Sequence, residues 1–281
     1  MLALQQVESP AVDLAAVGDL MFGRSVAARI QKEGYTAILG AATPELKKAD
    51  LAFGNLECVL SRRPFTQQKR FLFEGPEDAA PAIKDAGFSL VSVANNHSLD
   101  AGPSGLADTV AALNRAHIDR IGDSTDPLVL TRHGVRIAFL AYSDFPTIPG
   151  IRYTDEFRLA SAIKVARQQA DAVVISWHWG NEGIATPSPR QIKLAKLAAG
   201  AGADLVLGHH PHVWQPVEWL PGKDGHRCLV AYSLGNFVFD AIPMDQRKTG
   251  ILHVALSAKG VTGFSITPYE ILRGAPTRSS R

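Results

Sequence analysis

The sequence predicts an α/β fold. Short runs of β-branched and aliphatic residues, bounded by Gly, Asn or Asp, alternate with longer Ala-rich segments that have the period of an amphipathic helix. This alternation is typical of sheets whose strands are joined by helices. Hydrophobic residues make up 46% and charged residues 20% of the 281 residues, a balance that favours a buried core and argues against disorder.

Each predicted element follows from its local pattern. Compact apolar runs predict strands, in order along the chain, at residues 12–17, 51–53, 88–93, 137–142, 172–176, 205–207, 228–233, 251–256 and 261–268. Helical periodicity predicts helices at residues 24–32, 77–86, 105–116, 156–170 and 189–201. The last helix is expected to begin at Pro189, with Ser188 as its N-cap. His133-Gly134 lies between two β-type runs, so residues 128–142 are expected to form a hairpin.

No repeat or Pro/Gly linker divides the chain, so we expect one domain over residues 1–281. Its motif-bearing core covers about 12–240, and C-terminal strands and a basic tail follow at 241–281. The polar residues 273–281 predict a frayed end. The basic and aromatic segment 62–73 is expected to be an ordered loop or a hairpin.

Charge and cysteine content exclude several classes of protein. Lys and Arg number 29 against 27 Asp and Glu, a net charge of +2 that does not indicate a nucleic-acid partner. Two distant cysteines, Cys58 and Cys228, exclude a disulfide framework and a cysteine-based zinc module. The apolar stretch 228–239 is too short to span a membrane, and the N-terminus lacks a secretion-signal pattern. The sequence therefore predicts a cytoplasmic protein without a transmembrane segment.

Metal-capable side chains follow one predicted strand after another. They are Asp19, Glu57, Asn96, His97, His178, His209, His210 and His212. Because the carboxyl ends of parallel strands meet at one edge of a sheet, these residues are expected to converge. Turns or strand-edge packing are the structural alternatives for each motif taken singly. In an extended segment, His210 and His212 would lie on one side and His209 on the other.

The mixture of carboxylate, amide and imidazole groups favours Mn²⁺, Fe²⁺, Co²⁺ or Zn²⁺ over Ca²⁺. The number of candidate ligands exceeds the needs of one tetrahedral ion. Two divalent metal ions side by side can clamp the attacking and leaving oxygens of a phosphate ester. Hydrolysis is therefore the reaction that this pattern predicts.

Six short motifs together resemble the CapA family of capsule and poly-γ-glutamate biosynthesis proteins. In order they are GDLMFGR (18–24), GNLE (54–57), ANNHSLD (94–100), HWG (178–180), GHHPH (208–212) and SLGNF (233–237). The resemblance runs from about residue 12 to residue 240. That family is similar to the calcineurin-like metallophosphoesterases, which implies a four-layer α/β/β/α sandwich with a two-metal site between the sheet edges.

The resemblance also implies a role for each motif residue. One metal would be held by Asp19 and His212, the other by Asn96, His178 and His210, and Glu57 would bridge both. His97 would be a general acid that protonates the leaving group, with Asp100 as its orienting carboxylate. Two departures from the wider superfamily predict weaker binding of the metal that Asp19 and His212 would hold. Met21 stands where a His is usual, and Glu57 stands where an Asp is usual.

Other residues carry weaker expectations. Arg24 is a candidate clamp for an anionic substrate, with a solvated helix residue as the alternative. Asn236 is a candidate substrate-binding residue, with a turn role as the alternative. The loop 62–73 would collect an acidic polymer or be a solvated charged face. Cys58 is expected to be a buried, inert thiol.

Three functions remain open at this point. The first is a metal-dependent hydrolase acting on a phosphate ester or an anionic polymer. The second is a metal-dependent amide hydrolase of γ-linked glutamate, since the same machinery can attack a carbonyl. The third is a non-catalytic accessory protein that binds polyglutamate or capsule synthesis and export partners.

Overall fold

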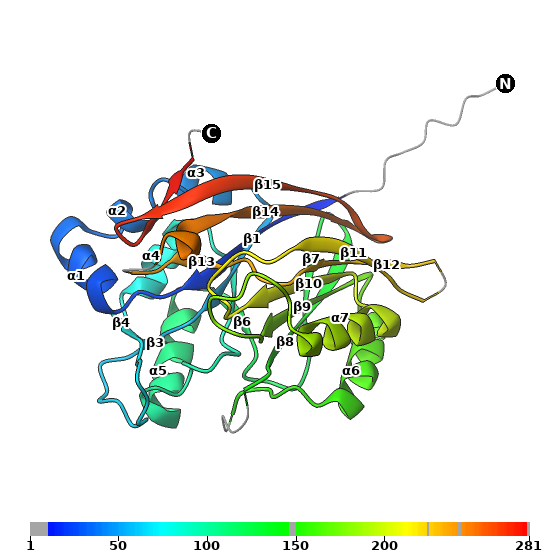
Figure 1. The fold of residues 1–281 in the computed structure, drawn as a ribbon, viewed down its shortest axis with the longest axis horizontal. Coiled ribbons are helices and arrows are strands. Elements are labelled where there is room, and N and C mark those ends of the chain that lie inside the picture. The colour runs from blue at the N-terminus through cyan, green and yellow to red at the C-terminus, as the bar shows by residue number, and fades with distance from the viewer. Residues whose placement is uncertain (1–10, 146–149, 224, 241–242, 280–281) are drawn as a thin grey trace.

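Two β-sheets form the middle of the structure, a computed structural model that describes residues 11–145, 150–223, 225–240 and 243–279 (Figure 1). The larger sheet has eight strands. They are β1 (Val12–Leu20), β2 (Leu51–Leu56), β5 (Leu90–Ser92), β6 (Asp119–Ile121), β13 (Asn236–Val238), β14 (Lys248–Ser257), β15 (Gly260–Leu272) and β16 (Ala275–Arg278). Their order is β16-β15-β14-β1-β2-β5-β6, and β13 pairs with β1.

The smaller sheet has six strands in the order β11-β12-β10-β9-β8-β7. They are β7 (Leu128–Arg132), β8 (Val135–Ser143), β9 (Ala172–His178), β10 (Leu205–His209), β11 (Val217–Pro221) and β12 (Arg227–Ala231). A separate pair joins β3 (Val59–Leu60) to β4 (Glu74–Gly75). The helices are α1 (Arg24–Glu33), α2 (Thr36–Leu39), α3 (Thr43–Leu46), α4 (Ala79–Asp85), α5 (Gly102–Arg115), α6 (Glu156–Gln169) and α7 (Pro189–Ala201), with a 3₁₀ turn at Met244–Arg247.

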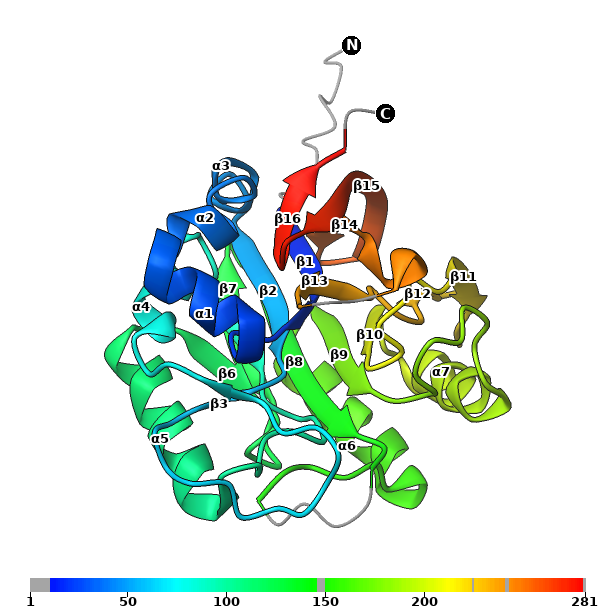
Figure 2. The same cartoon turned by 60° about the vertical axis from the view of Figure 1, so that its left-hand side comes forward.

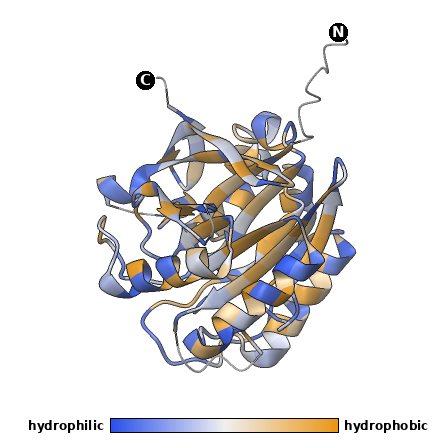
Figure 3. Ribbon diagram, turned by 90° about the vertical axis from the view of Figure 1, so that its right-hand side faces the viewer, coloured by the Kyte–Doolittle hydropathy of each residue, from blue (hydrophilic) through white to orange (hydrophobic). Residues whose placement is uncertain are grey.

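The smaller sheet is buried on both faces. Phe139, Val174 and Leu207 belong to the core shared with the larger sheet, whereas their chain neighbours pack in a second core with residues of α6 and α7. Figure 2 shows α1, α4 and α5 on one flank and α7 on the other. Apolar residues concentrate in the strands between these layers, and hydrophilic residues on the outer helices and loops (Figure 3). This confirms the expected four-layer α/β/β/α sandwich.

Sequence patterns identified the long elements well. The hairpin is confirmed, since β7 and β8 pair antiparallel. Helix α7 begins at Pro189 with a capping box between Ser188 and Gln191. The prediction of a frayed end at residues 273–281 is wrong for β16, because this strand pairs with β15 and buries Ala275. Residues 280–281 lie outside the described residues. Among the described residues, none of the helices combines the length and the apolar character needed to cross a bilayer.

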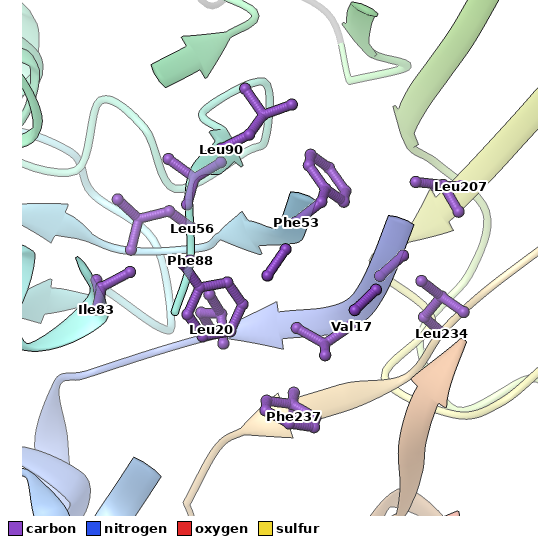
Figure 4. Packing of buried hydrophobic residues seen from close by; sticks show 14 of the residues in the cluster. Val17, Leu20, Phe53, Leu56, Ile83, Phe88, Leu90, Leu207, Leu234 and Phe237 are labelled. Atoms are coloured by element: carbon purple, nitrogen blue, oxygen red, sulfur yellow. The ribbon is translucent and has the colours of Figure 1, made fainter. Parts of the chain in front are cut away.

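The core next to the sheet edges is built around β1. Val17 and Leu20 of β1 point to one face of the sheet, and Phe53 of β2 points to the other (Figure 4). Leu234 and Phe237, from β13 and the residues before it, approach β1. Gly18 makes this approach possible, because a Cβ atom there would lie 1.9 Å from the carbonyl oxygen of Gly235. The same close backbone approach also delivers Asn236 to a register position beside Asp19.

We expect Gly18→Ala to lower the free energy of unfolding by about 3 kcal/mol, because the atom in its way belongs to the backbone and cannot rotate aside. Denaturant unfolding followed by circular dichroism measures this loss. Gly200→Ala in α7 is the matched control, since its Cβ would meet nothing within 4 Å and should stabilise the helix by up to about 1 kcal/mol. Equal stabilities for the two variants would contradict the packing argument.

Candidate metal centre

Six of the predicted ligands converge where the two sheets meet. Asp19, Glu57 and Asn96 come from the ends of β1, β2 and β5 in the larger sheet, and His178, His210 and His212 from the ends of β9 and β10 in the smaller one. His178 Nε2 lies 2.9 Å from Asn96 Oδ1 and 3.5 Å from Glu57 Oε1. His212 Nδ1 lies 3.3 Å from Asp19 Oδ2 and 3.9 Å from Glu57 Oε2. The strand ends therefore meet as predicted.

Potential ligand atoms form two overlapping sets that share Glu57. One set joins Glu57 with His210 and His212, the other joins it with Asp19 and His178, and the atoms within each set lie within 4.8 Å of one another. All five side chains are buried. A carboxylate shared by two ligand sets could contact two neighbouring cations.

The segment after β10 reaches the site by an unusual backbone path. His210 and His212 have φ values of 94° and 59°, in the region that non-glycine residues rarely adopt. The predicted extended alternation is therefore wrong, and a tight left-handed bend brings the two rings together, with 5.7 Å between their centroids. His209 is not turned away either, since its Nδ1 lies 3.5 Å from Asp19 Oδ1. Backbone strain of this kind is typical of functional sites.

Burial and neighbouring charges set the protonation of the two carboxylates. Burial alone would raise the pKa of Asp19, but the adjacent imidazoles of His209 and His212 hold that pKa well below its usual value. For Glu57, burial and the charge of Asp19 raise the pKa well above its usual value. The neighbouring imidazoles thus favour the ionised form of Asp19, whereas burial and repulsion from Asp19 disfavour the ionised form of Glu57 and outweigh the opposing effect of Lys69.

The pKa values of the three histidines are also shifted in different directions. Burial lowers the pKa of His178 well below its usual value, and burial together with His212 lowers the pKa of His210 to about 3. His212 differs, because Asp19 raises its pKa despite burial. Neutral imidazole is the form that binds metal ions, so His178 and His210 are already in the ligating state.

The residues present fit a divalent metal. Both carboxylate oxygens of Glu57 and the Nδ1 atom of His210 are buried without a hydrogen-bond partner in the described part of the chain. Unpaired buried polar groups are costly, and a cation would satisfy them. At the position of the usual His, the buried Met21 accepts a hydrogen bond from Gly23 N through its sulfur at 3.1 Å, so it shapes the local turn.

His97 and Asp100 form a buried pair beside the ligands. His97 Nδ1 lies 2.7 Å from Asp100 Oδ2, which also accepts a hydrogen bond from Phe73 N at 2.7 Å. The ring of Phe73 stacks on His97 at 3.9 Å. Lys69 forms an ion pair with Asp100 and donates to Asn96 O at 2.6 Å. The basic segment 62–73 is therefore an ordered loop that is fastened to this pair.

Several supporting residues were not identified from the sequence. Asn55 Nδ2 donates to Asp19 Oδ1 at 2.8 Å and lies 3.3 Å from His178 Nδ1. Asn95 Nδ2 in turn donates to Asn55 Oδ1 at 3.2 Å. Asn55 and Asn95 lie close in sequence to the candidate ligands Glu57 and Asn96, and this proximity was the sequence feature that could have identified them. The ring of Phe145 packs 4.3 Å from that of His210, and no motif pointed to it.

The two predicted substrate-binding residues occupy different places. Asn236 Oδ1 lies 2.8 Å from His212 Nδ1, so Asn236 orients a candidate ligand and is buried behind it. Arg24 lies at the mouth of the site, where it lines a small pocket together with His97 and His212. Cys58 is buried as expected, and burial raises the pKa of its thiol to about 12.

Comparisons with known proteins identify the family of the chain and a solved structure with the same fold. The chain is 32% identical to the capsule biosynthesis protein CapA of Bacillus anthracis over 96% of this chain and 70% of that protein. It is 31% identical to the PGA biosynthesis protein CapA of Bacillus subtilis (strain 168), over 92% and 72% of the respective chains. A hypothetical protein from Thermus thermophilus shares the fold with a TM-score of 0.59 at 16% identity, over 92% of this chain and all of that one. The model of the bacterial capsule synthesis protein family PGA_cap matches residues 13–241, so the chain belongs to that family.

Proposed function

We propose that this protein is a metal-dependent hydrolase that uses two divalent metal ions. By the family resemblance, Asp19 and His212 would hold one ion and Asn96, His178 and His210 the other, with Glu57 shared. The side-chain atoms in the structure instead group His210 with His212 and Asp19 with His178. Glu57 is the shared ligand in both groupings. The observation that carries the proposal is the convergence of two ligand sets on Glu57, whose oxygens are buried without a partner among the described residues. Mn²⁺, Fe²⁺, Co²⁺ and Zn²⁺ suit this mixed donor set.

The chemistry divides between metal and protein. Bound divalent ions supply Lewis-acid activation of water and of the substrate oxygen. Asp100 and Phe73 fix the ring of His97, whose Nδ1 faces Asp100. To act as the acid, His97 would need both ring nitrogens protonated, with Nδ1–H donating to Asp100 and Nε2 carrying the proton that a leaving oxygen or nitrogen takes. Lys69 neutralises the buried Asp100 carboxylate and ties the basic loop to the pair.

The substrate in this proposal is a phosphate ester or an anionic polymer of the capsule. The two CapA relatives are named for capsule and PGA biosynthesis, which supports a polyglutamate-related substrate or partner. An amide bond of γ-linked glutamate is a second candidate target, and His97 near the ligand cluster supports it equally, since nitrogen leaving groups also need a proton. Capsule synthesis proteins are the proposed partners. The proposed location is the cytoplasm.

The test is an assay of the purified protein reconstituted with each of the four metals. Aryl phosphomonoesters, phosphodiesters and poly-γ-glutamate of defined length are the substrates. We expect turnover or polymer shortening that needs metal and disappears in His178→Ala. Polymer binding that persists in that variant, with no turnover of any substrate, would favour the non-catalytic accessory role.

Metal should also stabilise the fold. Saturation at about 100 times the dissociation constant contributes about 2.7 kcal/mol, which for a chain of this size raises Tm by about 5 °C. Differential scanning fluorimetry with and without Mn²⁺ or Zn²⁺ measures the shift, and chelation should reverse it. An unchanged Tm at saturating metal would contradict the proposed centre.

A further inference from the structure

A small pocket opens beside the metal centre. Its lining includes Arg24, His97, Glu182, His212 and Asp240, and its volume is about 220 Å³. We call it the end pocket. Ligand pockets for drug-sized molecules measure about 300–1,000 Å³, so this one accommodates a single terminal unit of a substrate and not a stretch of polymer. Three aromatic side chains, Phe71, Phe73 and Phe239, and Gln246 also line it.

Arg24 is held in the end pocket by contacts on several sides. Its φ of 55° is strained for a residue with a side chain. The guanidinium packs over Phe71 and Phe73, 5.5 and 5.7 Å from their ring centres, and Nε pairs with Asp240 Oδ2 at 3.3 Å. Its two terminal nitrogens donate to none of the described residues, and 38% of the side chain is exposed. They are therefore positioned to bind a carboxylate.

Asp240 supplies the opposite charge. Its side chain is only 4% exposed, and Oδ2 also accepts hydrogen bonds from the backbone and hydroxyl of Ser25. Oδ1 is buried and accepts no hydrogen bond from any described residue. Glu182 adds a second carboxylate on the exposed side of the pocket. An anionic group alone would find Arg24 already neutralised by Asp240, and it would meet Glu182 as a like charge.

We propose that the end pocket binds a free α-amino-acid group, the zwitterionic amino end of a γ-linked glutamate chain. Arg24 would bind its α-carboxylate, and Asp240 and Glu182 its α-ammonium. Only a chain linked through the side-chain carboxyl presents both groups free on one terminal residue, because an α-linked peptide uses that α-carboxyl in its first bond. The inference rests on the proposed function, since it places a chain end beside the proposed hydrolytic centre.

Calorimetric titration tests this recognition. The probes are γ-glutamylglutamate, its N-acetyl derivative and free glutamate, each with the metal-free and the Mn²⁺-loaded full chain. We expect acetylation to weaken binding at least about 10-fold, because it removes the positive charge. Equal binding of the two dipeptides, or no binding of either, would overturn the proposal. Tighter binding of free glutamate than of the dipeptide would overturn the chain end as the ligand.

Variants separate recognition from folding. Asp240→Asn and the exposed Glu182→Gln should each reduce the preference for the free amino group, and Arg24→Gln should weaken both dipeptides. Lys32→Gln, an exposed change elsewhere on α1, is the control that should keep the wild-type preference. A preference unchanged in both Asp240→Asn and Glu182→Gln would overturn the assignment. Binding without turnover of any ester or amide would contradict only the hydrolase, whereas turnover without end preference would contradict only the end pocket.

Discussion

Glu57→Gln is expected to lower the affinity for divalent metal by more than about 100-fold. The variant keeps the shape of the side chain but removes the carboxylate that both ligand sets share. Changes to residues that merely support metal ligands already cost about 10- to 100-fold in affinity, so loss of a shared ligand should cost more. Turnover should fall with metal occupancy.

Metal content after dialysis, measured by plasma mass spectrometry, and titration calorimetry check this result. Glu74→Gln is the matched control, because that carboxylate lies outside both ligand sets and should leave metal content unchanged. Wild-type affinity in Glu57→Gln would mean that the two ligand sets do not act through a shared carboxylate, and the dinuclear proposal would fail.

His97→Gln should lower kcat by about 100- to 10,000-fold, the range for removal of a general acid, while metal content stays at the wild-type level. The side chain lies beside the ligands but belongs to neither ligand set. For substrates with good leaving groups, such as nitrophenyl esters, the decrease in kcat should be much smaller, because their leaving oxygen needs no proton. This dependence on the leaving group separates proton donation from a purely structural role.

Asp100→Asn should give a smaller loss in the same direction, since it leaves the ring of His97 in place but removes the negative charge of the carboxylate whose oxygen lies 2.7 Å from Nδ1. The exposed His117→Asn is the control and should keep full activity. If His97→Gln retains wild-type kcat on substrates with poor leaving groups, another group must donate the proton.

The convergence of the ligands was predictable because it depends on a local rule. Asp19, Glu57 and His178 each end an apolar strand, and parallel strands place their ends at one edge. The pairing of two sheets was not visible in periodicity, and only the family resemblance implied it. The positions of His210 and His212 depend on left-handed backbone, which no propensity of histidine predicts.

The sequence also did not predict contacts between residues that are far apart along the chain. Lys69 contacts Asp100, and Arg24 pairs with Asp240 across more than 200 positions of the chain. Such pairs are fixed by how the loops fold over the sheet edges, and a single sequence contains no local signal for them. The basic character of segment 62–73 was recognised, but its attachment to His97 and Asp100 required the structure.

The division of the ligands between the sheets has a mechanical consequence. Three candidate ligands come from the strand ends and following loops of each sheet, so a bound cation would cross-link the two sheets. Sliding of one layer over the other would pull the ligands apart before either layer lost its own hydrogen bonds. Loading with metal should therefore slow amide hydrogen exchange on β1 and β9 together, as one cooperative unit.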